Sequence, residues 1–334
     1  MTEGIQENNP LDVVIIGGGP AATAAGIYAA RRGLNFKIVA KDFGGEMATS
    51  GQIGNWPGEI DTDGIVMTER FKKHLKSYNV KIEEGIEVKS VHKQDDGLFC
   101  IMASTGKESK MAANRVDPEP NGALKCDYLA KTVIITTGVH PRELGVSGEK
   151  EYRNKGVSYC TTCDGPLFAG KTVATIGGGN SALESGLMLA DIAKNVYVIN
   201  KNPEFKGDKV LIDKLMKREN VEIIYNADTK EILGKDFVSN LKYKNTNESG
   251  DELKELQVDG IFVHIGMIPN SNIVPPDVAL DPLKQIIVNQ ACETNIPGLY
   301  AAGDVTSIPF NQIVIAAGMG CTALLSAVSY LNKL

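Results

Sequence analysis

A short stretch of the chain, GVSYCTTCDGPLF over residues 156–168, holds the residues best suited to chemistry. Two threonines separate Cys160 from Cys163, and Asp164 follows directly. A cysteine pair of this spacing can hold a metal, form a structural disulfide or cycle between dithiol and disulfide. Tetrahedral zinc needs four ligands, yet the sequence has no second C-x-x-C and its 4 histidines lie far apart. We therefore expect no metal site.

A working redox pair fits these residues better than an inert one, because stable disulfides are uncommon inside the cytoplasm. In C-x-x-C one thiol stabilises the thiolate of the other. The thiolate attacks the disulfide of a partner, and the second cysteine resolves the mixed disulfide. Asp164 is placed to hold or deliver a proton during this exchange, and it is also a suitable cap for the turn that follows. The two roles are compatible.

The remaining cysteines and His264 receive structural interpretations. Cys100 lies in the apolar segment LFCIMA and is expected to pack in the core. Cys126, Cys292 and Cys321 are assigned no chemistry. His264, in the segment IFVHIGM, is expected to be a buried histidine with its hydrogen bonds satisfied.

Composition narrows the class of protein. A chain of 334 residues fits about two domains, and its 35 glycines exceed average usage. The net charge of −6 offers no basic surface for nucleic acid or an anionic membrane. The N-terminal MTEGIQENNP is polar and acidic, unlike a signal peptide, and runs such as LDVVIIGGGP are shorter than a membrane-spanning helix. We expect a soluble, cytoplasmic protein that binds neither nucleic acid nor membrane.

One pattern occurs twice in the chain, starting at Leu11 and again at Lys171. Each copy reads as an apolar strand, a Gly-x-Gly turn, a helix of small residues and a second apolar strand, which is a βαβ dinucleotide unit. Helices are predicted over 21–32 and 181–193, with strands over 13–16, 36–39, 173–176 and 196–199. Short strands are predicted over 83–137, a polar hairpin loop without chemistry over 105–125, and a helix over 312–331.

These elements predict an α/β fold of two Rossmann-like domains, each a three-layer ββα arrangement, with one domain inserted into the other. The segments GVHPREL and GMIPN carry the Gly and Pro expected of hinges, so the chain should cross between domains near residues 142 and 265. The outer domain then comprises residues 1–142 and 265–334, and the inserted domain comprises residues 143–264.

The glycine loops predict two bound nucleotides. Gly17 permits the tight turn and Gly19 lets a pyrophosphate approach the backbone, with the following helix N-terminus facing the phosphates. Gly177 and Gly179 repeat this arrangement. Near the C-terminus, the stretch AAGDV places Asp304 at a strand end, where its carboxylate can hydrogen-bond a ribityl or ribose hydroxyl or cap the next turn.

Six motifs in this order resemble the low-molecular-weight thioredoxin reductases, and equally the flavoprotein core of the alkyl hydroperoxide reductase system. They are GGGPAATAA, NWPG, TTG, CTTCDG, GGGNSALE and AAGDV followed by NQIVIAAGMG. The resemblance implies FAD in the outer domain, NADPH or NADH in the inserted one, and a homodimer. It also implies rotation of one domain against the other during turnover.

The resemblance also implies roles for individual residues. Cys163 would lie nearer the flavin, Cys160 would exchange with the partner protein, and Asp164 would relay the proton. The residues implied to contact FAD are Gly17, Gly19, Pro20, Ala21, Gly45, Glu46, Asn55, Gly138, Gly303, Asp304, Gln312 and Ile313. Those implied to contact NAD(P)H are Gly177, Gly179, Asn180, Ser181, Asn200, Lys201 and Lys206.

Two departures from the family pattern bear on the cofactors. Glu46 stands where the family has a glutamine that meets the flavin ring. The family's arginines for the 2′-phosphate of NADPH are replaced within NKNPEFK, residues 200–206, which also lacks an acidic residue at position 200 for the 2′-hydroxyl of NADH. Lys201 and Lys206 could still bind a phosphate, less selectively than arginine. The pattern favours NADH or dual use and leaves the preference open.

The sequence therefore predicts an NAD(P)H-dependent thioredoxin-disulfide reductase. It would pass electrons through FAD and the Cys160–Cys163 disulfide to a thioredoxin-like or glutaredoxin-like protein. Three alternatives stay open: a flavin-dependent dithiol oxidase that uses oxygen, a reductase with a donor other than NAD(P)H, and a redox-sensing flavoprotein.

Overall fold

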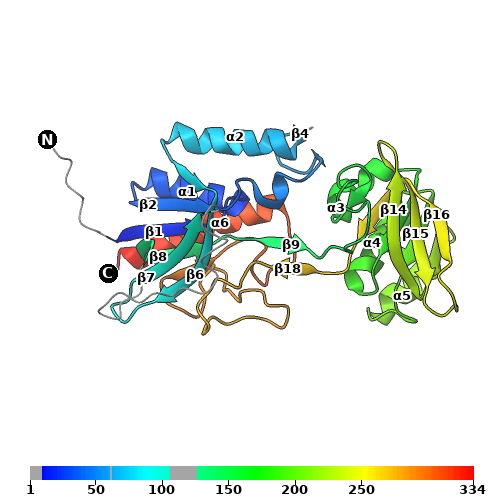
Figure 1. Cartoon of the computed structure of the whole chain (residues 1–334). Helices are drawn as coiled ribbons and strands as arrows, with labels where there is room; N and C mark the ends of the chain where they lie inside the picture. The colour runs from blue at the N-terminus through cyan, green and yellow to red at the C-terminus, as the bar shows by residue number, and fades with distance from the viewer. Residues whose placement is uncertain (1–9, 61, 106–125) are drawn as a thin grey trace. The chain divides into compact units, whose positions relative to one another are not determined.

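The computed structural model describes residues 10–60, 62–105 and 126–334. The chain forms two compact units (Figure 1). Unit 1 comprises the described parts of Met1–Ser50, Trp56–His140 and Ile268–Leu334, and unit 2 comprises Gly51–Asn55 and Pro141–Met267. The expectations for the N-terminal nine residues, and for the polar loop beyond Thr105, lie outside the described residues.

The chain enters and leaves the larger segment of unit 2, Pro141–Met267, through a pair of short strands. These are β9 (Val139–Pro141) and β18 (Met267–Pro269), which form a two-stranded sheet. They lie close to the crossing points that the Gly and Pro pattern predicted near residues 142 and 265.

Unit 1 is built on one large sheet. The strand order is β5 (Ile82–Glu84), β2 (Phe36–Ala40), β1 (Leu11–Ile16), β8 (Tyr128–Ile135), β7 (Phe99–Thr105) and β6 (Ile86–Lys93), and β19 (Leu299–Ala301) also pairs with β8. In this order β5, β2, β1 and β8 pair in parallel with their neighbours, and β19 pairs in parallel with β8. The pairs β6–β7 and β7–β8 are antiparallel. The predicted first βαβ unit is therefore confirmed.

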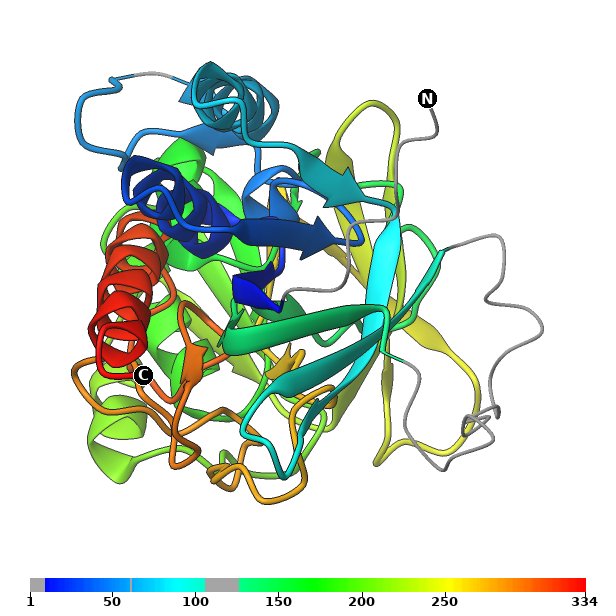
Figure 2. The same cartoon turned by 90° about the vertical axis from the view of Figure 1, so that its left-hand side faces the viewer.

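Both faces of this sheet are covered, as continuous apolar strands require. Val14 and Ile16 of β1 point into one core, and Val13 and Ile15 point into the other. The second core lies beneath α1 (Pro20–Arg31) and α6 (Ile313–Leu331), which lie side by side in Figure 2, while α2 (Gly64–Ser77) packs beside α1. The short elements η1 (Gly45–Met47), β3 (Gln52–Ile53) and β4 (Thr62–Asp63) connect β2 to α2.

The helix α6 is an exception to the expectation that the apolar runs of this chain are shorter than a membrane-spanning helix. Its 19 residues are long and apolar enough to cross a membrane by length and composition alone. Its small buried side chains, including Ala316 and Ala323, instead face the core that it shares with α1. At Gly320 the two helices touch, since a Cβ atom there would lie 2.0 Å from the carbonyl oxygen of Ala21.

Unit 2 holds the second predicted βαβ unit in a five-stranded parallel sheet. Its order is β10 (Val157–Ser158), β17 (Gly260–Val263), β11 (Thr172–Ile176), β12 (Asn195–Ile199) and β13 (Val221–Ile224). A three-stranded antiparallel sheet of β14 (Ala227–Gly234), β15 (Val238–Asn245) and β16 (Leu253–Gln257) adds a further layer. The helical elements are α3 (Thr161–Asp164), η2 (Gly165–Phe168), α4 (Asn180–Ala190) and α5 (Lys209–Leu215). The helix predicted over 181–193 ends at Ala190, because a turn over the next residues leads into β12.

A second disulfide, in unit 1, corrects the interpretation of two cysteines. Cys100 is buried in β7, as predicted, but its sulfur is bonded to that of Cys126, with Cα atoms 5.2 Å apart. The antiparallel pairing of β7 with β8 places Cys100 opposite Leu129, three residues beyond Cys126. This long-range register is what brings the two cysteines together, and it explains why their local sequences give no sign of pairing.

Candidate active site

The first glycine loop of unit 1 forms an open backbone cradle. Gly17 has φ +132°, and a Cβ atom at this position would lie 2.3 Å from the carbonyl oxygen of Thr136. Gly19 caps α1, and a Cβ atom there would approach nothing more closely than the Gly44 carbonyl oxygen at 4.0 Å. The helix then begins at Pro20, whose missing N–H is not needed in the first turn. The N–H groups of the first turn of a helix have no partner within the helix, and they suit a pyrophosphate.

Asp304 supplies an acceptor that lacks a partner within the described chain. Its Oδ1 atom is shielded from solvent and makes no hydrogen bond to the described residues. Burial, together with the nearby charge of Glu46, raises the pKa of Asp304 to about 6. Gly303, at φ +79°, leaves the backbone before Asp304 free of a side chain. A buried acceptor costs free energy unless a donor meets it, so this carboxylate fits a ligand hydroxyl such as those of the ribityl chain of FAD.

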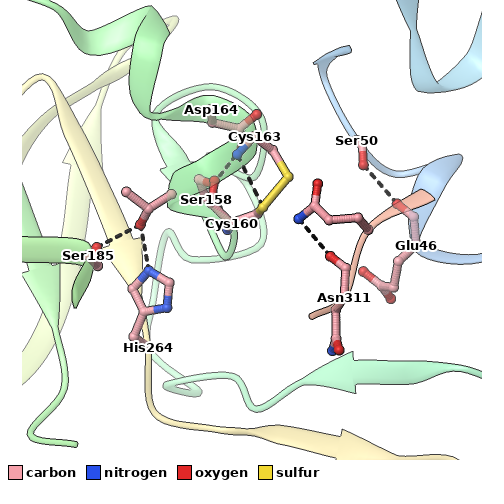
Figure 3. The surroundings of a disulfide bond; sticks show 11 residues. Glu46, Ser50, Ser158, Cys160, Cys163, Asp164, Ser185, His264 and Asn311 are labelled. Atoms are coloured by element: carbon pink, nitrogen blue, oxygen red, sulfur yellow. Dashed lines mark hydrogen bonds between the residues drawn. A yellow bond between two sulfur atoms is a disulfide. The ribbon is translucent and has the colours of Figure 1, made fainter. Parts of the chain in front are cut away.

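The other residues predicted to contact FAD are distributed as follows. Gly45 and Glu46 lie in η1, where the Glu46 carbonyl oxygen accepts a hydrogen bond from Thr49 Oγ1 at 3.0 Å. It also accepts one from Ser50 Oγ at 3.0 Å (Figure 3). Gln312 caps α6, and its Nε2 donates to the carbonyl of Asn311 at 2.8 Å. Ala21 lies in α1, Ile313 begins α6, and Gly138 has φ +65° after β8. Asn55 alone falls in the segment grouped with unit 2.

The cysteine pair lies at the start of α3 in unit 2. Cys160 and Cys163 form a disulfide with Cα atoms 5.3 Å apart, and both residues are half-buried. Cys160 caps the helix, and its Sγ accepts the backbone N–H of Cys163 at 3.2 Å. The two sulfurs therefore sit at a defined local turn, with the exposed Thr162 between them.

Asp164 lies directly behind this disulfide (Figure 3). The hydroxyl of Ser158 donates to its Oδ2 at 2.5 Å, and the backbone N–H of Cys160 donates to that hydroxyl at 3.1 Å. Burial raises the pKa of Asp164, and the Ser158 hydrogen bond acts in the opposite direction. The carboxyl makes no capping hydrogen bond to η2, so Asp164 does not cap the following turn with its side chain, as the sequence had allowed. A carboxyl of raised pKa beside a disulfide can hold a proton for exchange.

Sequence reasoning missed a polar network behind Thr161, the first threonine of C-T-T-C. Thr161 Oγ1 lies 2.7 Å from His264 Nε2 and 2.6 Å from Ser185 Oγ, and the Thr175 hydroxyl donates to Ser185 Oγ at 3.1 Å. Burial lowers the pKa of His264 to about 4, so the ring is neutral at pH 7. The expectation of a satisfied histidine is confirmed. The partner of its Nε2 atom, Thr161, comes from α3, and nothing local to the segment IFVHIGM points to it.

The second glycine loop, in unit 2, repeats the first. Gly177 has φ +149°, and a Cβ atom there would lie 2.2 Å from the carbonyl oxygen of His264. Gly179 caps α4, and a Cβ atom there would meet nothing within 4 Å, which leaves the space in front of the helix N-terminus open. Asn180 begins α4 and exchanges two hydrogen bonds with Asp208, at 2.8 and 2.9 Å. Ser181 follows it and is exposed.

The segment after β12 is folded onto this loop. The buried Asn200 donates from Nδ2 to the Glu204 carbonyl at 2.8 Å, and its Oδ1 accepts the N–H of Asn202 at 3.1 Å. The backbone N–H of Lys206 donates to the Gly178 carbonyl at 2.8 Å. Lys201 forms an ion pair with Asp228, its Nζ lying 3.1 Å from Oδ1. The amide of Asn200 thus shapes the loop, while Lys201 remains on its surface.

Two glycine loops that suit dinucleotides, together with a C-x-x-C disulfide, are features of flavin- and pyridine-nucleotide-linked disulfide oxidoreductases. The model of the family "Pyridine nucleotide-disulphide oxidoreductase" matches residues 11–320, and the chain belongs to this family. The family binds FAD and NAD(P)H, and the backbone cradles and the unpartnered Asp304 acceptor of this chain fit such groups.

Individual relatives refine this class. The chain is 41% identical over 332 residues to an alkyl hydroperoxide reductase component of Pseudomonas putida and 39% identical over 327 residues to an NADH dehydrogenase of Bacillus subtilis. These matches cover 99% and 98% of this chain, which spans about 60% of the length of either relative. Thioredoxin reductase from Streptococcus pyogenes is 32% identical with a TM-score of 0.87, and the match covers 98% of this chain and 100% of that one. The predicted resemblance and fold class are confirmed.

Proposed function

We propose that this chain is an FAD-dependent, NAD(P)H-oxidising reductase of protein disulfides whose partner is a small thioredoxin-like or glutaredoxin-like protein. The observation that supports this most directly is the Cys160–Cys163 disulfide with Asp164 behind it, in the unit that also carries the second nucleotide loop. We further propose that the protein acts in the cytoplasm as a homodimer.

The residues suit each step of the exchange. FAD, when bound, supplies the two-electron link between the nicotinamide and the disulfide. Once the pair is reduced, the Cys160 thiolate attacks a sulfur of the partner's disulfide, forming a mixed disulfide and releasing one partner thiolate. Cys163 then attacks Cys160, which restores the Cys160–Cys163 bond and frees the second partner thiolate. The raised pKa of Asp164 suits it to hold the proton that Cys163 loses and to deliver it to a leaving thiolate.

The partner class draws support from two directions. The thioredoxin reductase of Streptococcus pyogenes matches along its whole length, which favours a thioredoxin-like partner. The alkyl hydroperoxide reductase flavoproteins are comparably similar in sequence over this region, but this chain spans only part of them. A partner with a thioredoxin-type C-x-x-C disulfide is common to both possibilities.

An anaerobic titration tests the proposal. The purified holoprotein is titrated with NADH and, separately, with NADPH, while the bleaching of the flavin absorbance is followed. We expect stoichiometric, rapid bleaching by at least one nucleotide, and turnover of an added thioredoxin by the native protein. Cys160→Ser and Cys163→Ser should each abolish turnover, because neither can complete the exchange. Cys321→Ala serves as the matched control, because Cys321 is a free cysteine outside the pair, and this variant should keep full turnover.

The alternatives give different results. If dithionite bleaches the flavin and neither nucleotide does, a donor other than NAD(P)H is required. If a small dithiol bleaches the flavin and oxygen reoxidises it with no nucleotide present, the dithiol oxidase alternative is correct. If a nucleotide bleaches the flavin but no electrons reach the added thioredoxin, the sensor alternative is favoured.

A further inference from the structure

The ion pair between Lys201 and Asp228 lies beside the second glycine loop and bears on which nicotinamide nucleotide the protein accepts. In a βαβ dinucleotide unit, an acidic residue or an arginine near the end of the second strand reads the ribose 2′ position, and in this chain Lys201 is the first cation after that strand, β12. In this structure the ammonium of Lys201 already has an anionic partner. Asp228 Oδ1 lies 3.1 Å from Lys201 Nζ, and Asp228 Oδ2 lies 2.6 Å from the Nζ of Lys230.

The backbone holds Asp228 at this place. The N–H of Ala227 donates to the carbonyl of Asn200 at 3.0 Å, and the N–H of Asn226 donates to the carbonyl of Asn202 at 3.3 Å. Asn226 adopts φ +56°, in the left-handed region that asparagine tolerates better than most residues, so the chain turns there from β13 into β14. The first residues of β14 therefore lie against the end of β12, and their position is set by main-chain hydrogen bonds.

The Asp228 carboxylate is ionised at neutral pH. Burial by itself raises the pKa of Asp228, but hydrogen bonds from Lys230 and Lys201 outweigh it and hold the pKa below its usual value. The side chain retains 22% exposure, which leaves it accessible to a ligand at the surface.

An anionic acceptor at the end of the second strand of a βαβ unit is the device that selects an unphosphorylated ribose. The sequence lacks such a residue at position 200, and the amide of Asn200 is committed to Glu204 and Asn202. We propose that Asp228, at the start of β14, is the anionic acceptor for the ribose 2′-hydroxyl and makes the second nucleotide site selective for NADH over NADPH. This proposal rests on the proposed function. A 2′-hydroxyl can donate to this carboxylate, whereas a 2′-phosphate meets its negative charge and must displace it from Lys201.

The test measures ligand binding in the oxidised holoprotein by isothermal titration calorimetry, with ADP-ribose and 2′-phospho-ADP-ribose as probes. We expect the native protein to bind ADP-ribose more tightly. Asp228→Asn should shift the ratio of the two dissociation constants towards the phosphorylated probe by about tenfold, because one negative charge beside a phosphate of about −1.5 to −2 is removed. The lysines remain in place and become available to the phosphate.

Asp191→Asn is the matched control. Asp191 also pairs with a cation, since its Oδ1 lies 2.8 Å from Arg218 Nη2, but its side chain is 59% exposed and lies at the C-terminal end of α4, away from the glycine loop that begins this helix. This variant removes the same charge from the same unit and should leave the binding ratio unchanged.

The outcomes separate the two proposals. If the native protein prefers the phosphorylated probe, or if Asp228→Asn shifts the ratio no more than the control, the selectivity role of Asp228 is wrong and the proposed function stands. If the probes bind as expected and NADH does not bleach the flavin, the proposed function fails and the site assignment survives. If neither probe binds, both are overturned.

Discussion

The disulfide between Cys100 and Cys126 makes the sharpest prediction about stability. The bond closes a ring over a sequence separation of 26 residues. In the chain-entropy description, a ring of this length removes about 12 cal/mol/K from the unfolded ensemble, which is about 3.5 kcal/mol at 25 °C. For a unit of about 200 residues, this corresponds to a fall in Tm of about 7–14 °C when the bond is opened.

The assay compares one protein in two redox states. A background variant with Cys160→Ser and Cys163→Ser leaves Cys100–Cys126 as the one disulfide, so a reductant acts on a single bond. Its Tm is measured by calorimetry with and without dithiothreitol, and the same is done for a version that also carries Cys100→Ala and Cys126→Ala. The reductant should lower the Tm of the first protein and leave that of the second unchanged.

Thiol titration checks the chemical premise independently. The denatured, unreduced background variant should show two free thiols, those of Cys292 and Cys321. Four free thiols, or a Tm that reductant does not move, would refute the reasoning. Two free thiols together with a Tm that the reductant leaves unchanged would mean that the bond forms but does not constrain the unfolded chain as the ring length requires.

Three further predictions concern the core and the two sites. Gly320→Ala should destabilise the protein by about 1–3 kcal/mol in denaturant unfolding, because its Cβ would lie 2.0 Å from a backbone oxygen of α1, whereas Gly318→Ala on the same helix has open space and should be neutral or slightly stabilising. Asp164→Asn should lower thioredoxin turnover by about 10²–10⁴-fold and leave flavin bleaching by nucleotide unchanged, and equal loss in both assays would contradict the proton role. In the apoprotein, the raised pKa of Asp304 means that the folded state binds the extra proton, so stability from this group is present below pH 4 and is lost as pH rises to about 6. Asp304→Asn should remove this loss, which amounts to about 3 kcal/mol in the free energy of unfolding. Identical plots of unfolding free energy against pH for the native and Asp304→Asn apoproteins would disprove this prediction.

The sequence by itself determined the parts of this protein that depend on neighbouring residues. The glycine loops are recognisable because a tight turn and a close backbone approach need glycine at fixed spacing, and Gly17 and Gly177 adopt the positive φ angles that such turns require. The parallel strands are recognisable as continuous apolar runs because both of their faces are buried. The Cys160–Cys163 disulfide also spans a sequence separation of only 3 residues, so one turn of helix suffices to form it.

Only the tertiary structure decided the contacts that join distant segments. Cys100 meets Cys126 through the register of antiparallel strands, and Asp228 reaches Lys201 through main-chain hydrogen bonds between the ends of two strands. The neutral His264 meets Thr161 because a sheet strand and a short helix pack together. Each of these contacts depends on where the backbone runs after many turns, and no local pattern of residue types encodes that path. The nucleotide loops and the redox pair were therefore predictable from residue spacing, whereas the groups that tune them were placed by long-range packing.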